Sequence, residues 1–443
     1  MSHTEGALGL DELARMVGEP PLAGAPDPRA FDVQPWTPPN ALRRDLGLPE
    51  SLWVVSDRRP TSGPLAPEHV MGVGGASESL ATITPREPVA AALDLGCGSG
   101  VQALLLGYHA DRVVASDISP RALWCTALTC ALNDRPVPEL VLADLAGPFA
   151  PDEFDLVVSD PPFVMAPEAR HVYRDSPAPA DTLTARLLAD IARILRPGGT
   201  VVLLTSWLVP DDGDWATRVL GWADAGRWQR LWAALREQVT PEQYVDLWLL
   251  DSGQGRDAEL RLRWEHHLGA MGAAAIGFGW VLGVTSAGAA DEPSGGIWAE
   301  DVRSARVLPT GAQVRAEVDR RQGLPGAADL LGRGLRLADD AVLTAVDVGG
   351  HAAAADALLL SMASSWRGPQ PLDPALSWLF ARVTADRDAR VGRTITLAEL
   401  LPACADDTGW EAADVLVSWL SGVRDLLGAG FAALDGGPGP ARQ

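Results

Sequence analysis

Short apolar runs alternate with longer amphipathic segments between residues 89 and 205. The apolar runs predict buried strands, and the segments whose apolar positions recur every three or four residues predict helices. The predicted strands cover residues 89–95, 112–116, 140–143, 154–159 and 200–205, and the predicted helices cover residues 101–109, 121–133 and 182–195. Strands that alternate with helices at this spacing predict an α/β fold with a doubly wound, parallel, Rossmann-like sheet.

The chain on either side of this region is less regular. After it, we expect strands at 228–235 and 273–285, with helices at 241–250 and 256–268 between them, and then a polar turn at 291–296. Before it, a helix at 8–17, a proline-rich stretch and a strand at 52–55 predict a helical and irregular extension. The predicted domains are therefore an N-terminal extension at 1–70, an α/β domain at 71–296 and a C-terminal domain at 297–443.

The C-terminal domain is predicted to be mainly helical. Strands are expected within 335–348 and at 431–434, and helices at 374–383, after a capping box of Thr396 and Glu399, and at 410–427. Three helices followed by a strand resemble a small winged-helix module. The last helix carries three carboxylates and a single arginine, so we do not expect it to enter the major groove of DNA.

Charge and composition narrow the function classes. The 36 basic residues are all arginines and stand against 58 acidic residues, which gives a net charge of −22. The absence of lysine excludes a lysine Schiff base and a P-loop lysine. The acidic balance makes a nucleic-acid partner unexpected. No signal peptide or membrane span is expected, and four cysteines without metal-ligand spacing predict a cytoplasmic protein with no metal site. The oligomeric state stays open.

The most informative segment is the turn that follows the strand at 89–95. It reads Asp94-Leu95-Gly96-Cys97-Gly98-Ser99-Gly100, a G-x-G-x-G spacing that differs from the G-x-G-x-x-G of dinucleotide sites. A carboxylate before the glycines repels a pyrophosphate and attracts a sulfonium. Asp117 ends the next strand, where a carboxylate can accept both hydrogen bonds of a ribose diol. A cationic ligand that carries a ribose is S-adenosylmethionine.

A second motif, Asp160-Pro161-Pro162-Phe163, ends the strand at 154–159 and therefore falls beside the same ligand. An amide or aryl-amine nitrogen is a poor nucleophile because its lone pair is delocalised. The Asp160 carboxylate and the Pro161 carbonyl can each accept an N–H from such a nitrogen and orient it, and the ring of Phe163 offers a stacking face. The motif thus predicts methyl transfer to a planar nitrogen.

Together these segments, over about residues 70–280, resemble the class I S-adenosylmethionine-dependent methyltransferases. The resemblance implies that Asp94 and Gly96 lie beside the methionine part of the cofactor and that Asp117 binds its ribose. It further implies that Ile118 and Asp144 flank the adenine, with Leu145 packing nearby. Cys97, Gly98 and Gly100 complete the predicted cofactor site.

Residues 69–77 and 158–165, followed by Tyr173-Arg174-Asp175, are similar to release-factor glutamine methyltransferases and small-domain ribosomal-RNA guanine methyltransferases. Asp160 and Phe163 stand where the glutamine enzymes usually have Asn and Tyr. The combination found here, Asp with Phe, is better known among methyltransferases of nucleobase amines. Tyr173 and Arg174 are candidate substrate contacts, or alternatively part of a solvated loop that Arg174 holds to a carboxylate.

We therefore predict an S-adenosylmethionine-dependent N-methyltransferase (EC 2.1.1) that acts on an amide or amine of a peptide, a protein or a small molecule. Two alternatives are a methyltransferase of nucleobase amines and a non-catalytic regulatory protein that binds the cofactor. The intact motif at 160–163 favours an enzyme, since a protein that had lost the chemistry would be expected to lose the motif.

Overall fold

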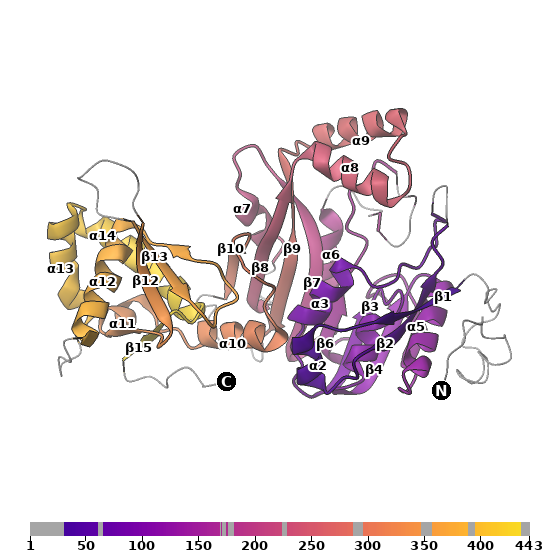
Figure 1. Cartoon of the computed structure of the whole chain (residues 1–443), viewed down its shortest axis with the longest axis horizontal. Helices are drawn as coiled ribbons and strands as arrows, with labels where there is room; N and C mark the ends of the chain where they lie inside the picture. The colour runs from indigo at the N-terminus through magenta and orange to yellow at the C-terminus, as the bar shows by residue number, and fades with distance from the viewer. Residues whose placement is uncertain are drawn as a thin grey trace. The chain divides into compact units, whose positions relative to one another are not determined.

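The computed structural model describes residues 31–60, 65–168, 170, 174–175, 181–223, 228–286, 296–346, 357–388 and 395–435. The chain divides into two compact units, Met1–Arg303 and Ser304–Gln443 (Figure 1). The helix predicted at 8–17 lies outside the described residues. No helix in the described ranges is long and apolar enough to cross a membrane.

The first unit is built on an eight-stranded sheet with the order β10-β8-β9-β7-β6-β3-β4-β5. Every neighbouring pair is parallel except those that β9 makes with β7 and β8. The strands are β3 (Val89–Leu95), β4 (Ala110–Asp117), β5 (Glu139–Leu142), β6 (Phe154–Ser159), β7 (Leu195–Val209), β8 (Trp228–Val239), β9 (Ala275–Thr285) and β10 (Ile297–Asp301). The predicted Rossmann-like sheet is confirmed, but it is mixed and not wholly parallel.

The reversal of β9 follows from the segment that precedes it. Helices α8 (Pro241–Asp251) and α9 (Ala258–Ala270) pack against each other between β8 and β9. A helical hairpin returns the chain to the end of the sheet from which it left, so the next strand must run back antiparallel. Figure 1 shows the pair beyond one end of the sheet. The hairpin begins with a capping box between Thr240 and Gln243, which holds its start in place.

Helices cover both faces of the sheet. On one face α3 (Gly75–Ile83), α4 (Val101–Leu106) and α5 (Pro120–Leu132) contact one another in sequence order. On the other, Leu187, Leu188 and Ile191 of α6 (Thr182–Ile194) are fully buried in one core with residues of β3, β6 and β7. The short α7 (Trp215–Leu220) adds to the same core. Each buried Leu or Ile stabilises this layer by about 1.5–3 kcal/mol.

The region before α3 forms a small hairpin. Strands β1 (Phe31–Trp36) and β2 (Leu52–Asp57) pair antiparallel around the helix α2 (Asn40–Leu46). Strand β1 was not predicted because Pro35 lies in it, and proline is tolerated in this two-stranded sheet, which has edges on both sides. The amide of Val55 donates to Oγ1 of Thr129 in α5 at 3.0 Å, which fastens the hairpin to that helix.

In the described residues of the second unit, helices pack beside two small sheets. Helices α12 (Pro374–Asp388), α13 (Leu397–Thr408) and α14 (Ala412–Gly428) enclose a core that includes Phe380 and Trp419. Strand β11 (Leu335–Leu337) pairs with β15 (Ala432–Leu434), and β12 (Ala341–Val346), β13 (Ala357–Met362) and β14 (Gln370–Pro371) form the other sheet. Helices α10 (Gly311–Gln322) and α11 (Ala327–Leu331) precede them. The winged-helix assignment stays a prediction.

The division between the units falls later than 291–296, where the sequence predicts a polar turn; of that turn only residue 296 is among the described residues. Strand β10 pairs in parallel with β8, so it belongs to the sheet of the first unit. The first compact unit ends at Arg303, and the second begins at Ser304. A five-residue strand gives a weak local signal, which is why the sequence placed it in the C-terminal domain.

Candidate active site

A large cavity opens at the carboxyl ends of β3, β4, β5 and β6. Its volume of about 700 Å³ lies in the range of pockets that enclose a drug-sized ligand. Loops that leave parallel strands converge at this edge, which is where open α/β sheets bind ligands. Every residue predicted for cofactor binding except Gly100 lines the cavity, as do Asp160, Pro161, Pro162 and Phe163.

The turn after β3 takes its shape from three glycines. Gly96, Gly98 and Gly100 have φ angles of 80°, 52° and 80°, a region that glycine enters without steric cost. A Cβ on Gly100 would lie 2.6 Å from the Cα of Thr126 in α5, so a larger residue would displace that helix. Gly100 therefore shapes the turn without lining the cavity.

Asp94 is buried in the floor of the cavity. Its Oδ2 accepts a hydrogen bond of 2.8 Å from the amide of Ala103, which fixes the first turn of α4 against β3. Burial, with a smaller contribution from the nearby Asp117 and Asp160, raises the pKa of Asp94 to about 7. Asp117 and Asp160, predicted separately from the sequence, are thus close enough to Asp94 to influence its ionisation.

Asp117 ends β4 and organises the loop around it. Its Oδ2 accepts from the amide of Gly98 at 3.0 Å, and its Oδ1 accepts from the amide of Ser119 at 2.8 Å. Burial raises the pKa of this carboxyl above its usual range. Each oxygen keeps a further lone pair, so the carboxylate can still accept hydrogen bonds from a ligand in the cavity.

The loops after β4 and β5 supply an apolar wall. Ile118 is 53% exposed although its side chain is large and apolar, and it lines the cavity together with Asp144 and Leu145. The backbone of Leu145 has a φ of 54°, a conformation that non-glycine residues adopt only under constraint. An exposed apolar side chain beside a cavity offers a surface for a flat ring.

The motif that begins at Asp160 follows β6 directly. Burial raises the pKa of Asp160 to about 7. The ring of Phe163 is half-buried and meets Phe278 of β9 edge-on, with 6.4 Å between the ring centres. The carbonyl of Phe163 accepts a hydrogen bond of 3.0 Å from Oγ of Ser206 in β7. These contacts hold the ring in place, so the face it presents is preorganised.

Ser159, which sequence reasoning passed over, couples the two halves of the site. Its Oγ donates a hydrogen bond of 2.7 Å to the carbonyl of Leu95. Leu95 directly precedes the glycine turn, and Ser159 directly precedes Asp160. The bond therefore fixes the spacing between the two motifs. No local pattern distinguishes such a serine from others in buried strands.

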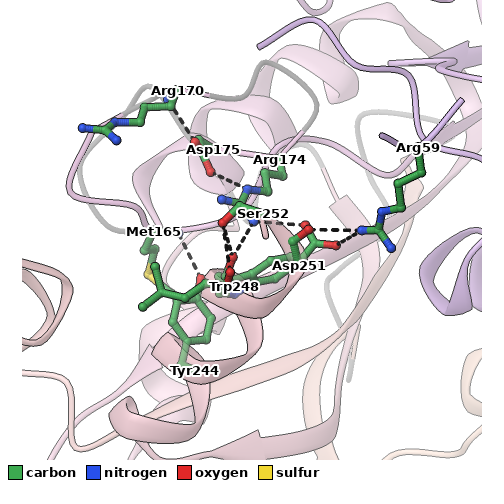
Figure 2. A network of polar contacts seen from close by, with 10 residues as sticks. Arg59, Met165, Arg170, Arg174, Asp175, Tyr244, Trp248, Asp251 and Ser252 are labelled. Carbon is green, nitrogen blue, oxygen red and sulfur yellow. Dashed lines mark hydrogen bonds and ion pairs between the residues drawn. The ribbon is translucent and has the colours of Figure 1, made fainter. Parts of the chain in front are cut away.

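Of the two candidate substrate contacts, Tyr173 lies outside the described residues. Arg174 lines the cavity, but its side chain is only 6% exposed. Its Nε donates to Oδ1 of Asp175 at 3.0 Å, and its Nη1 donates to Oδ2 of Asp251 at 3.0 Å and to the carbonyl of Trp248 at 2.9 Å (Figure 2). Its charge is thus already compensated within the chain.

A second wall of the cavity comes from segments to which no role was assigned from sequence. The last turns of α8 contribute Leu247, Trp248 and Asp251, and the segment before α3 contributes Glu68 and His69. Residues 69–77 carried part of the family resemblance, which is a signal for the second group. Nothing local marks α8, because its residues reach the cavity only through the tertiary fold.

The donor sets found do not suit a metal. In the described ranges, no three His, Cys, Asp or Glu side chains are grouped closely enough to hold a metal ion. All four cysteines are buried and unpaired with one another.

Comparisons with known proteins agree with this geometry. Residues 72–209 match the family model described as "Methyltransferase small domain". A release factor glutamine methyltransferase of Koribacter versatilis is 32% identical over 148 residues, which are 30% of this chain and 52% of that protein. A ribosomal RNA small subunit methyltransferase C of Alcanivorax borkumensis is 29% identical over 118 residues, which are 27% of this chain and 33% of that protein.

The matched part of the chain spans about half the length of the first of these curated relatives and a third of the second. Among solved structures, phosphoethanolamine N-methyltransferase 2 of Haemonchus contortus aligns with 48% of this chain and 53% of its own at 17% identity, with a TM-score of 0.32. A score this low carries no conclusion. The family match covers residues 72–209 of the domain predicted at 71–296, and it confirms the predicted resemblance of that region to methyltransferases.

Proposed function

We propose that this small-domain methyltransferase transfers the methyl group of S-adenosylmethionine to a planar amide or amine nitrogen. The observation that carries the proposal is that the glycine turn, Asp117 and the Asp160–Phe163 motif line one cavity. A cofactor site and an acceptor motif in the same cavity are what direct methyl transfer requires.

The residues present fit the cofactor. Asp94 and Asp160, whose pKa values burial raises to about 7, suit a cation, because a positive charge between them relieves the cost of ionising both. Asp117 can accept the two hydroxyl hydrogens of a ribose, and the exposed side chain of Ile118 can cover one face of an adenine. When bound, S-adenosylmethionine supplies an electrophilic methyl group on a sulfonium.

The acceptor nitrogen is oriented by the second motif. The carboxylate of Asp160 accepts one N–H, the carbonyl of Pro161 accepts another, and the face of Phe163 supports the planar group. Both prolines lack N–H donors that would compete for these oxygens. As the nitrogen forms its bond to the methyl carbon, the carbon–sulfur bond breaks and its electron pair remains on sulfur.

The proton that the nitrogen loses passes to Asp160 or, through it, to water. A carboxyl with a pKa of about 7 is close to neutral pH, which is where a general base works best. Ser159 supports this role by holding the end of β6 against the end of β3. It acts as a positioning residue and does not itself touch the reacting atoms.

The test is methyl transfer by Asp160 variants, assayed with methyl-labelled S-adenosylmethionine and an extract of the source organism. Asp160→Ala should lower the rate about 10²–10³-fold, the typical effect of losing one preorganised hydrogen-bonding partner. Its affinity for S-adenosylhomocysteine should change little, because the glycine turn and Asp117 remain. Near-normal transfer by Asp160→Ala would contradict the planar-nitrogen mechanism.

Asp160→Asn separates two versions of the role. It keeps an acceptor oxygen but cannot take a proton. Retained activity would assign Asp160 to orientation, and activity as low as that of Asp160→Ala would assign it to charge or proton acceptance. Absence of transfer by the wild-type protein, despite cofactor binding, would favour the alternative of a non-catalytic regulatory protein.

The nucleobase alternative has two supports. One is the similarity to ribosomal RNA small subunit methyltransferase C of two organisms. The other is the combination of Asp160 and Phe163, which is better known among methyltransferases of nucleobase amines. Against this alternative stands the net charge of −22, because binding to RNA draws chiefly on basic side chains that neutralise phosphates. An amide or amine of a peptide, a protein or a small molecule is therefore the preferred acceptor. A cytoplasmic location belongs to the same proposal.

A further inference from the structure

The wall of the cavity formed by the end of α8 and by Arg174 is held together by hydrogen bonds and an ion pair. Arg174 lies at the carboxyl end of α8, where it bonds the carbonyl of Trp248 and the side chain of Asp251. A cation at this position is favoured by the negative end of the helix dipole. The guanidinium also lies 5.5 Å from the centre of the Trp248 ring. We call this group, with Leu247, the α8 wall.

The arginines around the α8 wall are paired with carboxylates. Arg59 reaches Asp251 from the opposite side to Arg174, with 3.0 Å between Nη2 and Oδ1 (Figure 2). Arg170 pairs with Glu168 at 2.7 Å, while its backbone amide donates to Oδ2 of Asp175 at 2.9 Å. Deeper in, Arg121 forms a bidentate pair with Asp57, close to His69.

The cavity as a whole is lined by more carboxylates than arginines. Among the described lining residues, seven are acidic and two are arginines: Glu68, Asp94, Asp117, Asp144, Asp160, Asp175 and Asp251 against Arg170 and Arg174. A site that binds a nucleic acid needs basic side chains available to phosphates. Here a phosphate would meet repulsion from the carboxylates, and displacing an arginine from its partner would leave a carboxylate uncompensated.

The same wall presents apolar surface to an acceptor. Leu247 is 47% exposed and lines the cavity, as do Trp248 and Phe163. A flat, uncharged group can pack between such side chains at little cost in desolvation, whereas a phosphate cannot. The apolar lining and the charge of the cavity therefore favour the same kind of ligand.

We propose that the α8 wall is the acceptor subsite and that it selects an uncharged or cationic amide or amine acceptor with no phosphate near the methylated nitrogen. This inference rests on the proposed methyl transfer. The acceptor group belongs either to a peptide or to a small metabolite, since both can present the same chemistry.

The first test follows the label from methyl-labelled S-adenosylmethionine into an extract of the source organism, using the full chain. The extract is divided by filtration into small and large molecules, and the large fraction is treated separately with nuclease or protease. We expect label in protease-sensitive material, which would indicate a peptide source, or in small molecules that an anion exchanger does not retain. Nuclease-sensitive label, or label on small molecules that phosphatase releases from an anion exchanger, would overturn the inference.

An absence of label in every fraction, with S-adenosylmethionine binding shown by calorimetry, would overturn the methyl transfer itself. Label on a phosphate-bearing acceptor would leave that transfer standing and reject only the acceptor class. The two failures are therefore distinguishable.

The second test compares two aspartates of α8. Its substrate is the extract fraction in which the first test finds label, taken from untreated extract that has not yet been methylated by the protein. Asp251→Asn removes a charge from the α8 wall, whereas Asp246→Asn removes one that is exposed and paired with Arg261 of α9, away from the cavity. We expect Asp251→Asn to raise the KM for the acceptor at least fivefold with kcat and the affinity for S-adenosylhomocysteine within about twofold of wild type. Identical KM values for the two variants would remove the α8 wall from acceptor binding.

Discussion

The two walls of the cavity are held in place by different means. The wall assigned to the cofactor consists of short loops at strand ends, and its shape depends on backbone geometry, above all the positive φ angles of Gly96, Gly98 and Gly100. The α8 wall consists of side chains from segments far apart in the chain, joined by the ion pair of Arg174 with Asp251, and Arg59 pairs with the same carboxylate from outside the wall. The first resists substitution, whereas the second can change its ligand through a few side chains.

This difference suits a protein that keeps one cofactor and acquires its own acceptor. Backbone that must turn sharply beside a strand leaves few alternatives to glycine. Surface segments on a rigid scaffold can vary more freely, and specificity commonly resides there. We therefore expect changes in the cofactor wall to affect binding of the cofactor and the stability of the fold, and changes in the α8 wall to affect only the acceptor.

The largest effect on the cofactor wall should come from Gly100→Ala. The new methyl group would lie 2.6 Å from the Cα of Thr126 and force a residue with φ of 80° into an unfavourable region. We expect a loss of about 3 kcal/mol or more in the free energy of unfolding, together with loss of cofactor binding. Thermal unfolding and calorimetry measure both.

Gly98→Ala is the matched control, because its φ of 52° is also positive but nothing lies within 4 Å of the added Cβ. It should cost only about 1–2 kcal/mol. Equal effects of the two substitutions would show that the packing of the turn against α5 does not matter.

The next effect in size concerns Asp117→Ala. Losing charged hydrogen bonds to a ribose should weaken binding of S-adenosylhomocysteine by about 1–3 kcal/mol, or roughly 5- to 150-fold, in calorimetric titrations. Asp111→Ala is the control, since Asp111 is exposed at the opposite end of the same strand. If both variants bind as tightly as wild type, the ribose assignment is wrong.

These residues also show what could be predicted from the sequence. The strands at 89–95 and 154–159 were predicted with their observed bounds, because a buried parallel strand is a continuous apolar run ended by a turn. Asp94, Asp117 and Asp160 were found because each adjoins such a strand. The signal in every case lies within a few residues of the side chain concerned.

The α8 wall could not be found in this way. Asp251 lies 77 residues from Arg174 in the chain, and no sequence motif contains both residues. The loop position of Arg174 left two predictions open, a substrate contact or a bond to a carboxylate. The structure shows the second, because Arg174 bonds Asp175, Asp251 and the end of α8. Strand β1 and helix α3 were also missed, because Pro35 and the glycines before α3 indicate turns when read locally.

A smaller effect is expected on the stability of the ligand-free protein. Burial raises the pKa of Asp160 above its value in the unfolded chain, so the folded state binds this proton more tightly and loses stability as the pH rises from about 4 to about 7. Asp160→Asn cannot ionise. Because the side chain of Asp160 is only partly buried and water screens its charge, the substitution should raise the free energy of unfolding by about 1–2 kcal/mol at pH 8. Chemical denaturation at pH 8 and pH 5 measures this.

The gain from Asp160→Asn should shrink at pH 5, where the wild-type carboxyl is protonated in the folded state. A destabilised variant at pH 8, or a gain that does not depend on pH, would contradict the burial of an ionisable carboxyl at this position.

The central claim is that buried carboxylates in this cavity receive a sulfonium, and paired calorimetric titrations with S-adenosylmethionine and S-adenosylhomocysteine test it most directly. The pKa values of Asp94 and Asp160 are raised to about 7, so both are largely ionised at pH 8 and largely protonated at pH 6. If the cation binds the ionised form, its affinity should fall about tenfold per coupled carboxyl between pH 8 and pH 6. S-adenosylhomocysteine, whose sulfur is uncharged, should show a clearly smaller change. Identical pH profiles for the two ligands, or no binding of either, would contradict the account.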